Sequence, residues 1–398
     1  MKFYLKNDKM KKGLLRTLGR IFLLVILFAL VPAAYFLPSL LIKGEAADYY
    51  CRSIFPWISL LPVAINGMFI NSLTELAVVV GTVLAPVLIL LFIIKCIRIG
   101  LRRDLRHMLR FVYKTLRSLA VLAIIAALLF EAMHGINYNR TSVRKSMHLY
   151  GDTRPYSDYA ETLEWAYAGM IESRKELGED YNGVAHMMSS FERAVFDANV
   201  AVVSVSEIYD LGLSGNYIHA KAVMLSRLWR YTDIVGAYDP FLAEANVNTD
   251  YIDILHFPVT LCHELAHAKG YASETDANTI AVLSCINSER ADFRYAGYYY
   301  IFMRLWGTVH DYAAYEGVAI IDYASNEQFA AVIRDMQAYN DYNEIFNTGF
   351  IADLISRFSE DVNNAFLESN GQEGGTSTYV VPQNAYVEYY CRFVRTDA

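Results

Sequence analysis

The chain has 398 residues, of which 55% are apolar and 14% aromatic, so it is neither disordered nor low in complexity. Its net charge of −7 is unevenly divided: residues 1–137 hold 17 Lys or Arg and 6 Asp or Glu, whereas residues 138–398 hold 18 and 36. The acidic second part would repel phosphate, which excludes nucleic acid as its partner.

Three apolar segments in the first part predict membrane-spanning helices at residues 21–42, 76–97 and 118–137. The first is a run of 22 residues without a charge, long enough at ~1.5 Å per residue to cross a hydrocarbon core of ~30 Å. The third is weaker because Glu131 interrupts it, which an interfacial position or a polar contact would make tolerable. A cleaved signal peptide is the competing interpretation of the first run, but the run exceeds a typical signal sequence and no small-x-small site closes it.

The basic residues predict how these spans are oriented. Seven Lys or Arg precede the first span and eight lie from Lys95 to Arg117, around the connection between the second and third spans, so the positive-inside rule places both groups in the cytoplasm. Three spans then deliver residues 138–398 to the extracytoplasmic face of the cell membrane, as one domain in a multi-pass protein. Within the outer connection, residues 55–70 are too short and too broken to span the bilayer, so we expect an interfacial or re-entrant segment.

The second part is expected to be mainly helical, with a small β element. An amphipathic helix follows Ser157, which is a plausible N-terminal cap. Residues 199–209 alternate partly between apolar and polar side chains, as a strand does. Residues 236–248 are too irregular for a helix and are expected to be extended.

The stretch CHELAHAKG contains an HExxH motif, the clearest chemical signal in the chain. Pro258 suits the first turn of a helix and Gly270 suits its C-terminal end, so the residues between them are expected to be helical. At 3.6 residues per turn, His263 and His267 share one face, and both imidazoles can bind one metal ion. We expect this ion to be Zn²⁺.

Glu264 lies beside the first histidine, rotated by roughly a third of a turn, where it can hold a water next to the metal. Zinc lowers the pKa of such a water toward ~7, so Glu264 is the expected general base and then general acid. The alternative is an ordinary helix with Glu264 on a solvated surface. However, the neighbours of the motif are apolar, and its three polar groups would then be buried without an evident partner, which is costly.

Two carboxylates downstream, Glu274 and Asp276, compete for the third ligand position. Ser273 can cap a new helix, on which Glu274 and Asn278 are four residues apart and share a face. Glu274 could then bind the metal while Asn278 bonds the far nitrogen of a ligand histidine and fixes its tautomer. Asp276 points ~160° away from Asn278, so Glu274 is the predicted ligand and Asp276 the alternative.

The chain resembles an uncharacterised group of bacterial membrane proteins that combine about three N-terminal spans with an HELAH-x-x-G-[FY]-x-x-E-x-[DE]-A-N core. Three blocks show the likeness: LSRLWRYTDIVGAYDPFLAEANVN, HELAHAKGYASETDAN and NNAFLESNGQEGGTSTY. The Glu-x-x-Ala-Asn element also resembles the one that supplies the glutamate ligand in zincins of the gluzincin type. The likeness implies a zincin-like metallopeptidase domain after the transmembrane helices, and it implies no substrate.

The group that stabilises the oxyanion is not defined by the sequence. Zincins commonly use Tyr, His or Arg, and the candidates are Tyr295, His310 and Tyr379, although each tyrosine of a tyrosine-rich chain more often serves packing. Residues 244–248, EANVN, are either an edge strand that pairs with substrate backbone or a polar turn.

The predicted function is therefore a membrane-anchored zinc metallopeptidase that hydrolyses a peptide or protein substrate. The alternative is a non-catalytic, zinc-containing membrane scaffold or sensor. Intact Glu264 argues against it, because a structural site closes all four positions with protein ligands. A channel or transporter is disfavoured by the low polarity of the three spans.

Overall fold

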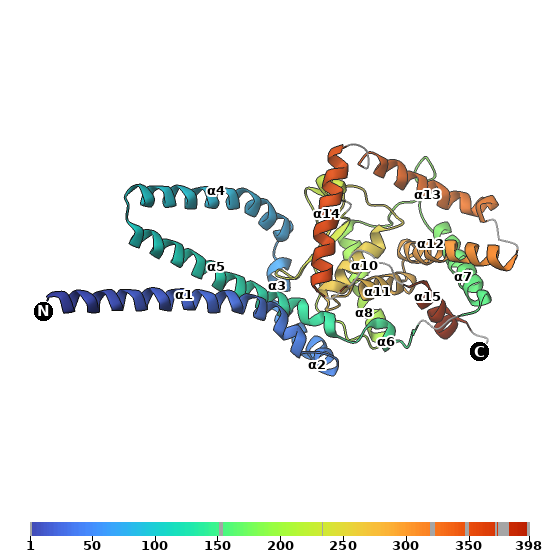
Figure 1. Ribbon diagram of the computed structural model, residues 1–398. Helices are drawn as coiled ribbons and strands as arrows, with labels where there is room; N and C mark the ends of the chain where they lie inside the picture. The colour runs from blue at the N-terminus through green and yellow to red at the C-terminus, as the bar shows by residue number, and fades with distance from the viewer. Residues whose placement is uncertain are drawn as a thin grey trace. The chain divides into compact units, whose positions relative to one another are not determined.

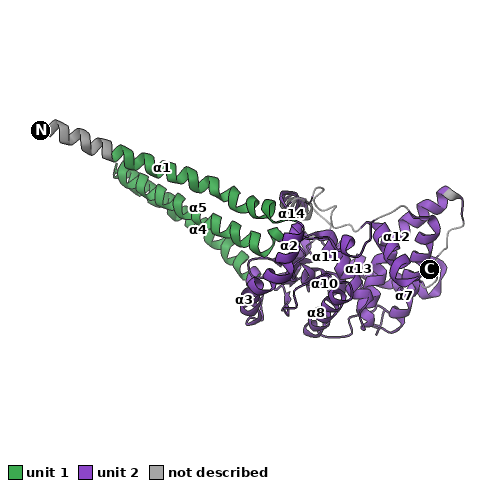
Figure 2. Ribbon diagram, turned by 90° about the horizontal axis from the view of Figure 1, so that it is seen from below, with its two compact units in different colours: residues 1–43, 75–136 green, residues 44–74, 137–398 purple. Residues whose placement is uncertain are grey.

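The computed structural model describes residues 2–150, 154–232, 234–318, 323–346, 350–370, 372 and 382–395. The chain is mainly helical, as predicted, and forms two compact units (Figures 1 and 2). The first unit holds residues 1–43 and 75–136, and the second holds residues 44–74 and 137–398. The second unit thus includes a segment that lies between the first two apolar helices in the sequence.

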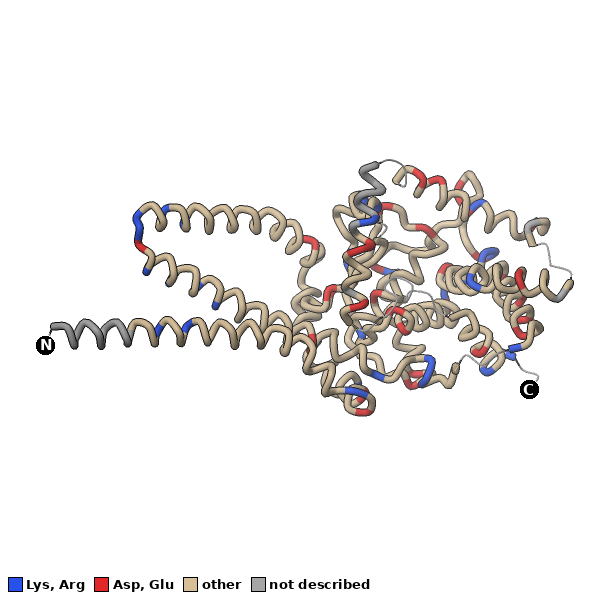
Figure 3. Tube along the Cα trace, viewed as in Figure 1, with Lys and Arg blue, Asp and Glu red and all other residues tan. Residues whose placement is uncertain are grey.

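The first unit is built from three helices that are long and apolar enough to cross a membrane: α1 (Lys2–Leu41), α4 (Leu73–Leu101) and α5 (Leu105–Met133). Each predicted span overlaps one of them, and the third prediction extends four residues past the end of α5. The helix α5 begins 13 residues before the predicted third span, because the Asp104 side chain caps it by accepting a hydrogen bond from the His107 backbone at 2.9 Å. The basic residues around the connection between the second and third predicted spans therefore lie largely on α4 and α5, toward the ends that this connection joins (Figure 3).

Glu131 has the polar contact that its position in an apolar helix requires. Its carboxylate accepts a hydrogen bond from the backbone N–H of Ser39 at 3.1 Å and another from the Ser39 hydroxyl. Because α1 and α5 pack against each other, this polar pair is shared between two helices of the first unit. An acidic group in such a helix is costly unless it is bonded in this way.

The second unit combines twelve described α-helices with a three-stranded sheet. The helices are α2 (Glu45–Tyr49), α3 (Phe55–Gly67), α6 (Val143–Ser146), α7 (Tyr156–Lys175), α8 (Phe191–Ile208), α9 (Ser226–Trp229), α10 (Phe257–Ala268), α11 (Glu274–Ile286), α12 (Ala291–Glu316), α13 (Glu327–Glu344), α14 (Phe350–Ser369) and α15 (Gln383–Tyr389). The strands are β1 (Lys221–Ala222), β2 (Gly236–Asp239) and β3 (Glu244–Val247). Their order is β1-β3-β2, with β3 parallel to β1 and antiparallel to β2.

Two local predictions for this unit are wrong. Residues 199–209 form the second half of α8 and its end, not a strand, because Val195, Ala198, Val202 and Val205 recur at helical spacing and bury one face. The burial of that face outweighs the small helix penalty of β-branched residues. The helix predicted from Ser157 begins one residue earlier, so Ser157 lies inside α7 and does not cap it.

The strand β3 is central in the sheet, which excludes the first of the two alternatives for residues 244–248, an edge strand. All four of its residues are buried, and the two-residue strand β1 covers the side that was expected to be free. The Glu244 carboxylate accepts hydrogen bonds from the Ser72 hydroxyl at 2.6 Å and from the Thr74 backbone at 2.9 Å. Glu244 thereby caps the first turn of α4.

Candidate metal centre

The two histidines of the motif lie on α10, a helix with an almost completely buried surface. Pro258 is in its first turn, and the Asp253 side chain holds the preceding turn by accepting hydrogen bonds from the backbone N–H groups of Leu255 and His256 at 3.0 and 2.7 Å. The strands β2 and β3 and the helices α8 and α11 pack against α10. The motif is thus on an almost fully buried helix, where unpaired polar groups are costly.

Three donor atoms meet at one point between α10 and α11. His263 Nε2 lies 3.0 Å from His267 Nε2, and Glu274 Oε2 lies 3.1 Å from the first of these nitrogens and 3.3 Å from the second. His263, His267 and Glu274 form the group of possible metal ligands found in the described part of the chain. The Ser273 hydroxyl caps α11 and so fixes the turn from which Glu274 projects.

Asp276, the alternative ligand, lies outside this group. Its buried carboxylate accepts a hydrogen bond from the Val143 backbone at 2.9 Å. Burial raises the pKa of Asp276 to about 6, against the opposing effect of that hydrogen bond. The side chain therefore joins α11 to the start of α6, and Glu274 faces the histidines instead.

The other ring nitrogens of both histidines have acceptors. His263 Nδ1 lies 2.8 Å from Asn278 Oδ1, and His267 Nδ1 lies 2.7 Å from the carbonyl oxygen of Tyr271. In a neutral histidine, an acceptor at Nδ1 favours the proton there and directs the Nε2 lone pair toward the cluster. Two such lone pairs and a carboxylate oxygen then face one another, an arrangement that either a shared proton or a metal cation would stabilise.

The turn that presents the Tyr271 carbonyl is held by a buried arginine. Gly270 has a φ of +109°, a conformation that favours glycine. Arg140 donates to the carbonyls of Gly270 and Leu211, each at 2.7 Å, and its guanidinium lies 3.6 Å from the centre of the Tyr271 ring. The acceptor for His267 is therefore fixed independently of the metal ligands.

The electrostatics of the cluster couple His267 to Glu274. Burial lowers the pKa of His267, but the neighbouring Glu274 carboxylate outweighs this effect and raises the pKa to about 9. Burial raises the pKa of Glu274, but the two histidines hold it well below its usual value. Without a metal the cluster thus retains a proton, which a metal ion would displace on binding.

The donor set and its spacing fit zinc. Two imidazoles and one carboxylate are a common set of protein ligands for catalytic zinc, which keeps its fourth position for water or substrate. Ligands on a tetrahedron with bonds of ~2.1 Å lie about 3.4 Å apart. The three distances in the structure, from 3.0 to 3.3 Å, are close to that value.

Glu264 lies beside the cluster and is not one of its three donors. Its carboxylate is buried, and Oε2 has no hydrogen-bond partner among the described residues. Burial raises the pKa of Glu264 to about 6, while His263 and His267 act to lower it. A buried carboxylate with a free oxygen next to a metal site is suited to hold and deprotonate a water.

The edge strand β2 passes directly over this carboxylate, a feature that the sequence did not indicate. A side chain at Gly236 would collide with the Glu264 carboxylate, so glycine permits the close approach. Two residues on, the half-buried Tyr238 ring stacks on His267, with centroids 6.3 Å apart and planes at 19°. The sequence predicted only that residues 236–248 are extended, and it did not indicate that they contact Glu264 or His267.

The residues predicted to stabilise an oxyanion have other contacts. The Tyr295 hydroxyl donates to the Asp335 carboxylate at 2.7 Å, and the His310 ring packs on Trp306 with centroids 4.1 Å apart. Tyr379 lies outside the described residues. The role of Tyr295 or His310 in stabilising an oxyanion remains a prediction that the geometry does not support.

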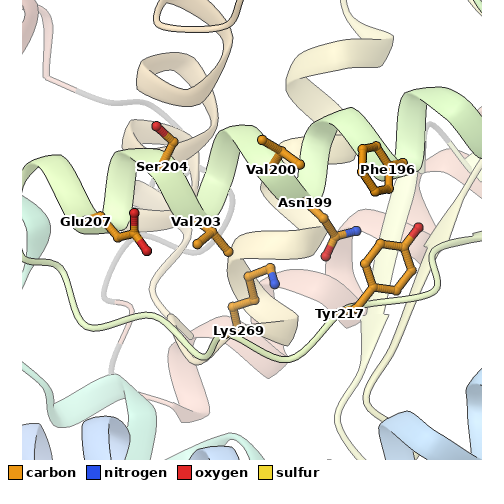
Figure 4. Close-up of a pocket in the computed structure, with 9 residues that line it drawn as sticks. Phe196, Asn199, Val200, Val203, Ser204, Glu207, Tyr217 and Lys269 are labelled. Atoms are coloured by element: carbon orange, nitrogen blue, oxygen red, sulfur yellow. The ribbon is translucent and has the colours of Figure 1, made fainter.

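A cavity of about 310 Å³ lies between α8 and the segment that precedes β1 (Figure 4). Lys269, two residues after His267, lines it, and its ammonium donates to the Asn216 carbonyl at 2.6 Å. Burial lowers the pKa of Lys269 to about 7. None of the three donor residues lines this cavity, so it is separate from the metal cluster.

Replacing Asn278 with alanine is expected to lower zinc affinity by ~10–100-fold, because the acceptor that orients His263 is lost. Chelator competition on the purified chain measures this change. Asn278→Asp, which keeps an acceptor oxygen, is the matched control and should bind zinc nearly as well as the original. Equal affinities for Asn278→Ala and the unaltered chain would contradict the role of this hydrogen bond.

The family described as "Protein of unknown function (DUF3810)" matches residues 50–381, which is most of the chain and includes His263, His267 and Glu274. A search of curated proteins and a search of solved structures each found no match.

Proposed function

The chain belongs to this family of unknown function, and from that premise we propose that it is a zinc-dependent metallopeptidase. Three helices would anchor it in the cell membrane, with its second unit on the extracytoplasmic side and zincin-like in fold. The strongest support is the convergence of His263 Nε2, His267 Nε2 and Glu274 Oε2 beside the free oxygen of Glu264. The charge distribution along the chain supports the orientation.

The proposed chemistry assigns a task to each group. Zinc, when bound, lowers the pKa of a water and polarises a carbonyl oxygen. Glu264 would take the proton of that water and deliver it to the leaving amine. Asn278 and the Tyr271 carbonyl hold the protons at Nδ1, so that both histidines present their Nε2 atoms.

The substrate would lie along β2 as an extended segment. In the described sheet β2 pairs with β3 along one edge, which leaves its other edge for an added strand. Because Gly236 lies over Glu264, a peptide paired with β2 would pass close to the proposed base.

A non-catalytic zinc site is the second candidate, and one observation favours it. The side chains of the cluster are at most 9% exposed, which is typical of structural metal sites. A structural site would, however, use a fourth protein ligand, and Glu264 is not among the donors that converge. Retention of zinc without any hydrolysis would support this candidate.

Metal content of the full chain, purified in detergent, tests the ligand set. We expect close to one zinc per chain in the unaltered protein, loss of zinc in His263→Ala, a sharp reduction in Glu274→Ala, and retention in Asp276→Asn. The physical reason is that only the first two replacements remove a converging donor. Mass spectrometry of the bound metal gives the result.

Two outcomes would contradict this proposal. Retention of zinc in Glu274→Ala with loss in Asp276→Asn would move the third ligand by two residues. A folded chain that takes up no zinc under any loading condition would exclude the metallopeptidase.

A further inference from the structure

The helix α3 has two apolar faces, of which only one is used inside the second unit. Phe55, Ser59, Val63 and Asn66 recur at helical spacing and are buried. The opposite face and the residues after it are exposed, with Trp57 at 76%, Leu61 at 68%, Met68 at 80% and Ile70 at 93%. A contiguous apolar surface of this kind marks an interaction site.

The position of α3 in the chain indicates what covers this surface. The helix α1 ends at Leu41 and α4 begins at Leu73, so both ends of the intervening segment are continuous with helices that can cross a membrane. From Ser53 to Thr74 there is no charged residue. A short, uncharged segment that returns to the same bilayer face and presents a tryptophan is suited to the lipid–water interface.

We infer that the exposed face of α3 is a lipid-binding surface, with which the second unit docks on the bilayer that its spans cross. The helix is a fixed part of that unit. Asn216 donates to the Pro56 carbonyl at 2.8 Å, and Lys221 of β1 donates to the carbonyls of Asn66 and Phe69. A side chain at Gly67 would collide with His219, so the end of α3 packs tightly.

The same segment is bonded to the strands at the candidate metal centre. Asp239 and Glu244 are paired in the β2–β3 register and lie at the turn of this hairpin. Asp239 accepts a hydrogen bond from the Thr74 hydroxyl at 3.0 Å, and Glu244 accepts one from the Thr74 backbone at 2.9 Å. Because this segment also carries α3, docking through α3 would bring the hairpin that passes over Glu264 to the bilayer surface.

This placement restricts the substrate class, a step that rests on the proposed function. A peptide paired with β2 would lie at the bilayer surface, so the favoured substrates are segments next to a membrane anchor, either a spanning helix or an acyl chain. Freely diffusing peptides would reach the site less often, because attachment to the bilayer raises the local concentration of substrate.

Quenching of Trp57 by lipid tests the docking surface. Three forms of the full chain are compared: the unaltered protein, Trp57→Phe and Trp229→Phe. Each is reconstituted in phosphatidylcholine vesicles, once with brominated acyl chains and once without bromine. We expect brominated lipid to quench the unaltered protein, Trp57→Phe to lose most of that quenching, and the half-buried control Trp229→Phe to retain it. The conservative replacements keep an aromatic ring and test neither metal binding nor catalysis.

Three results would overturn the inference. Equal quenching of Trp57→Phe and the unaltered protein would show that Trp57 is not in lipid. Quenching of Trp57 by acrylamide in place of brominated lipid would place it in water. Protection from both quenchers would mean that protein, such as a second copy of the chain, covers the face.

A second measurement separates this inference from the proposed function. One peptide is offered in the same vesicles with and without an acyl anchor, and we expect ~10-fold or faster cleavage of the anchored form. Equal rates would overturn the substrate restriction. Cleavage of neither form, with Trp57 quenched by lipid, would contradict the peptidase and leave the docking surface intact.

Discussion

Glu264→Gln is expected to abolish peptide hydrolysis while zinc content stays unchanged. Glutamine has nearly the same volume, but it can neither accept a proton from water nor pass one to the leaving amine. General acid–base catalysis contributes ~10²–10⁴-fold in rate, so residual activity should fall by at least that range. The carboxylate is not one of the three converging donors, so its loss should leave the metal bound.

Hydrolysis of a fluorogenic peptide mixture and metal content are measured on the same preparation. Glu176→Gln, a change at a half-exposed surface ion pair with Arg294, is the matched control and should retain both. Loss of zinc in Glu264→Gln would mean that Glu264 holds the metal directly. Full activity with full zinc would place the base elsewhere and remove the central step of the proposed chemistry.

The parts of the site that the sequence predicted depend on local geometry. His263 and His267 share a face because they are four residues apart on one helix, and Ser273 caps the next helix as its position suggested. Asn278 lies 2.8 Å from a ring nitrogen of His263, one turn beyond Glu274 on the same face. Helical periodicity fixes such relations without knowledge of the rest of the fold.

The parts that were missed depend on contacts between distant segments. Tyr238 reaches His267 only because β2 pairs with β3, and β3 is central only because the two-residue strand β1 pairs with it. A two-residue strand has no periodicity to detect. The packing of residues 44–74 with the second unit also escaped prediction, because their apolar character suits both a protein core and a lipid surface.

Asp335→Asn is expected to cost about 3–5 kcal/mol of stability, because it breaks a buried ion pair and leaves the buried Arg174 with only its ion pair to the half-exposed Glu179. The Asp335 side chain is fully buried and accepts from Arg174 Nε at 2.6 Å, while the Arg174 side chain is only 4% exposed. The carboxylate also accepts from the Ala185 backbone at 2.8 Å and from the Tyr295 hydroxyl at 2.7 Å. An amide oxygen cannot replace all of these bonds.

Thermal unfolding of the full chain in detergent should show the midpoint lowered by roughly 10 °C. Asp210→Asn is the control: its ion pair with Arg52 is on the surface, with Asp210 90% exposed, and should contribute at most about 1 kcal/mol. Similar midpoints for the two variants would contradict the assignment of Asp335 as a buried anchor.

The same network decides between two roles for Tyr295. If its hydroxyl serves Asp335, as the 2.7 Å bond indicates, Tyr295→Phe should lower the unfolding midpoint by a few degrees, in line with about 1–3 kcal/mol for one lost bond to a charged group. Hydrolysis per folded molecule should then be unchanged. If Tyr295 instead stabilised an oxyanion, the midpoint would hardly move and the rate would fall by ~10²-fold or more. Because stability and rate change in opposite patterns, one variant measured both ways separates a structural tyrosine from a catalytic one.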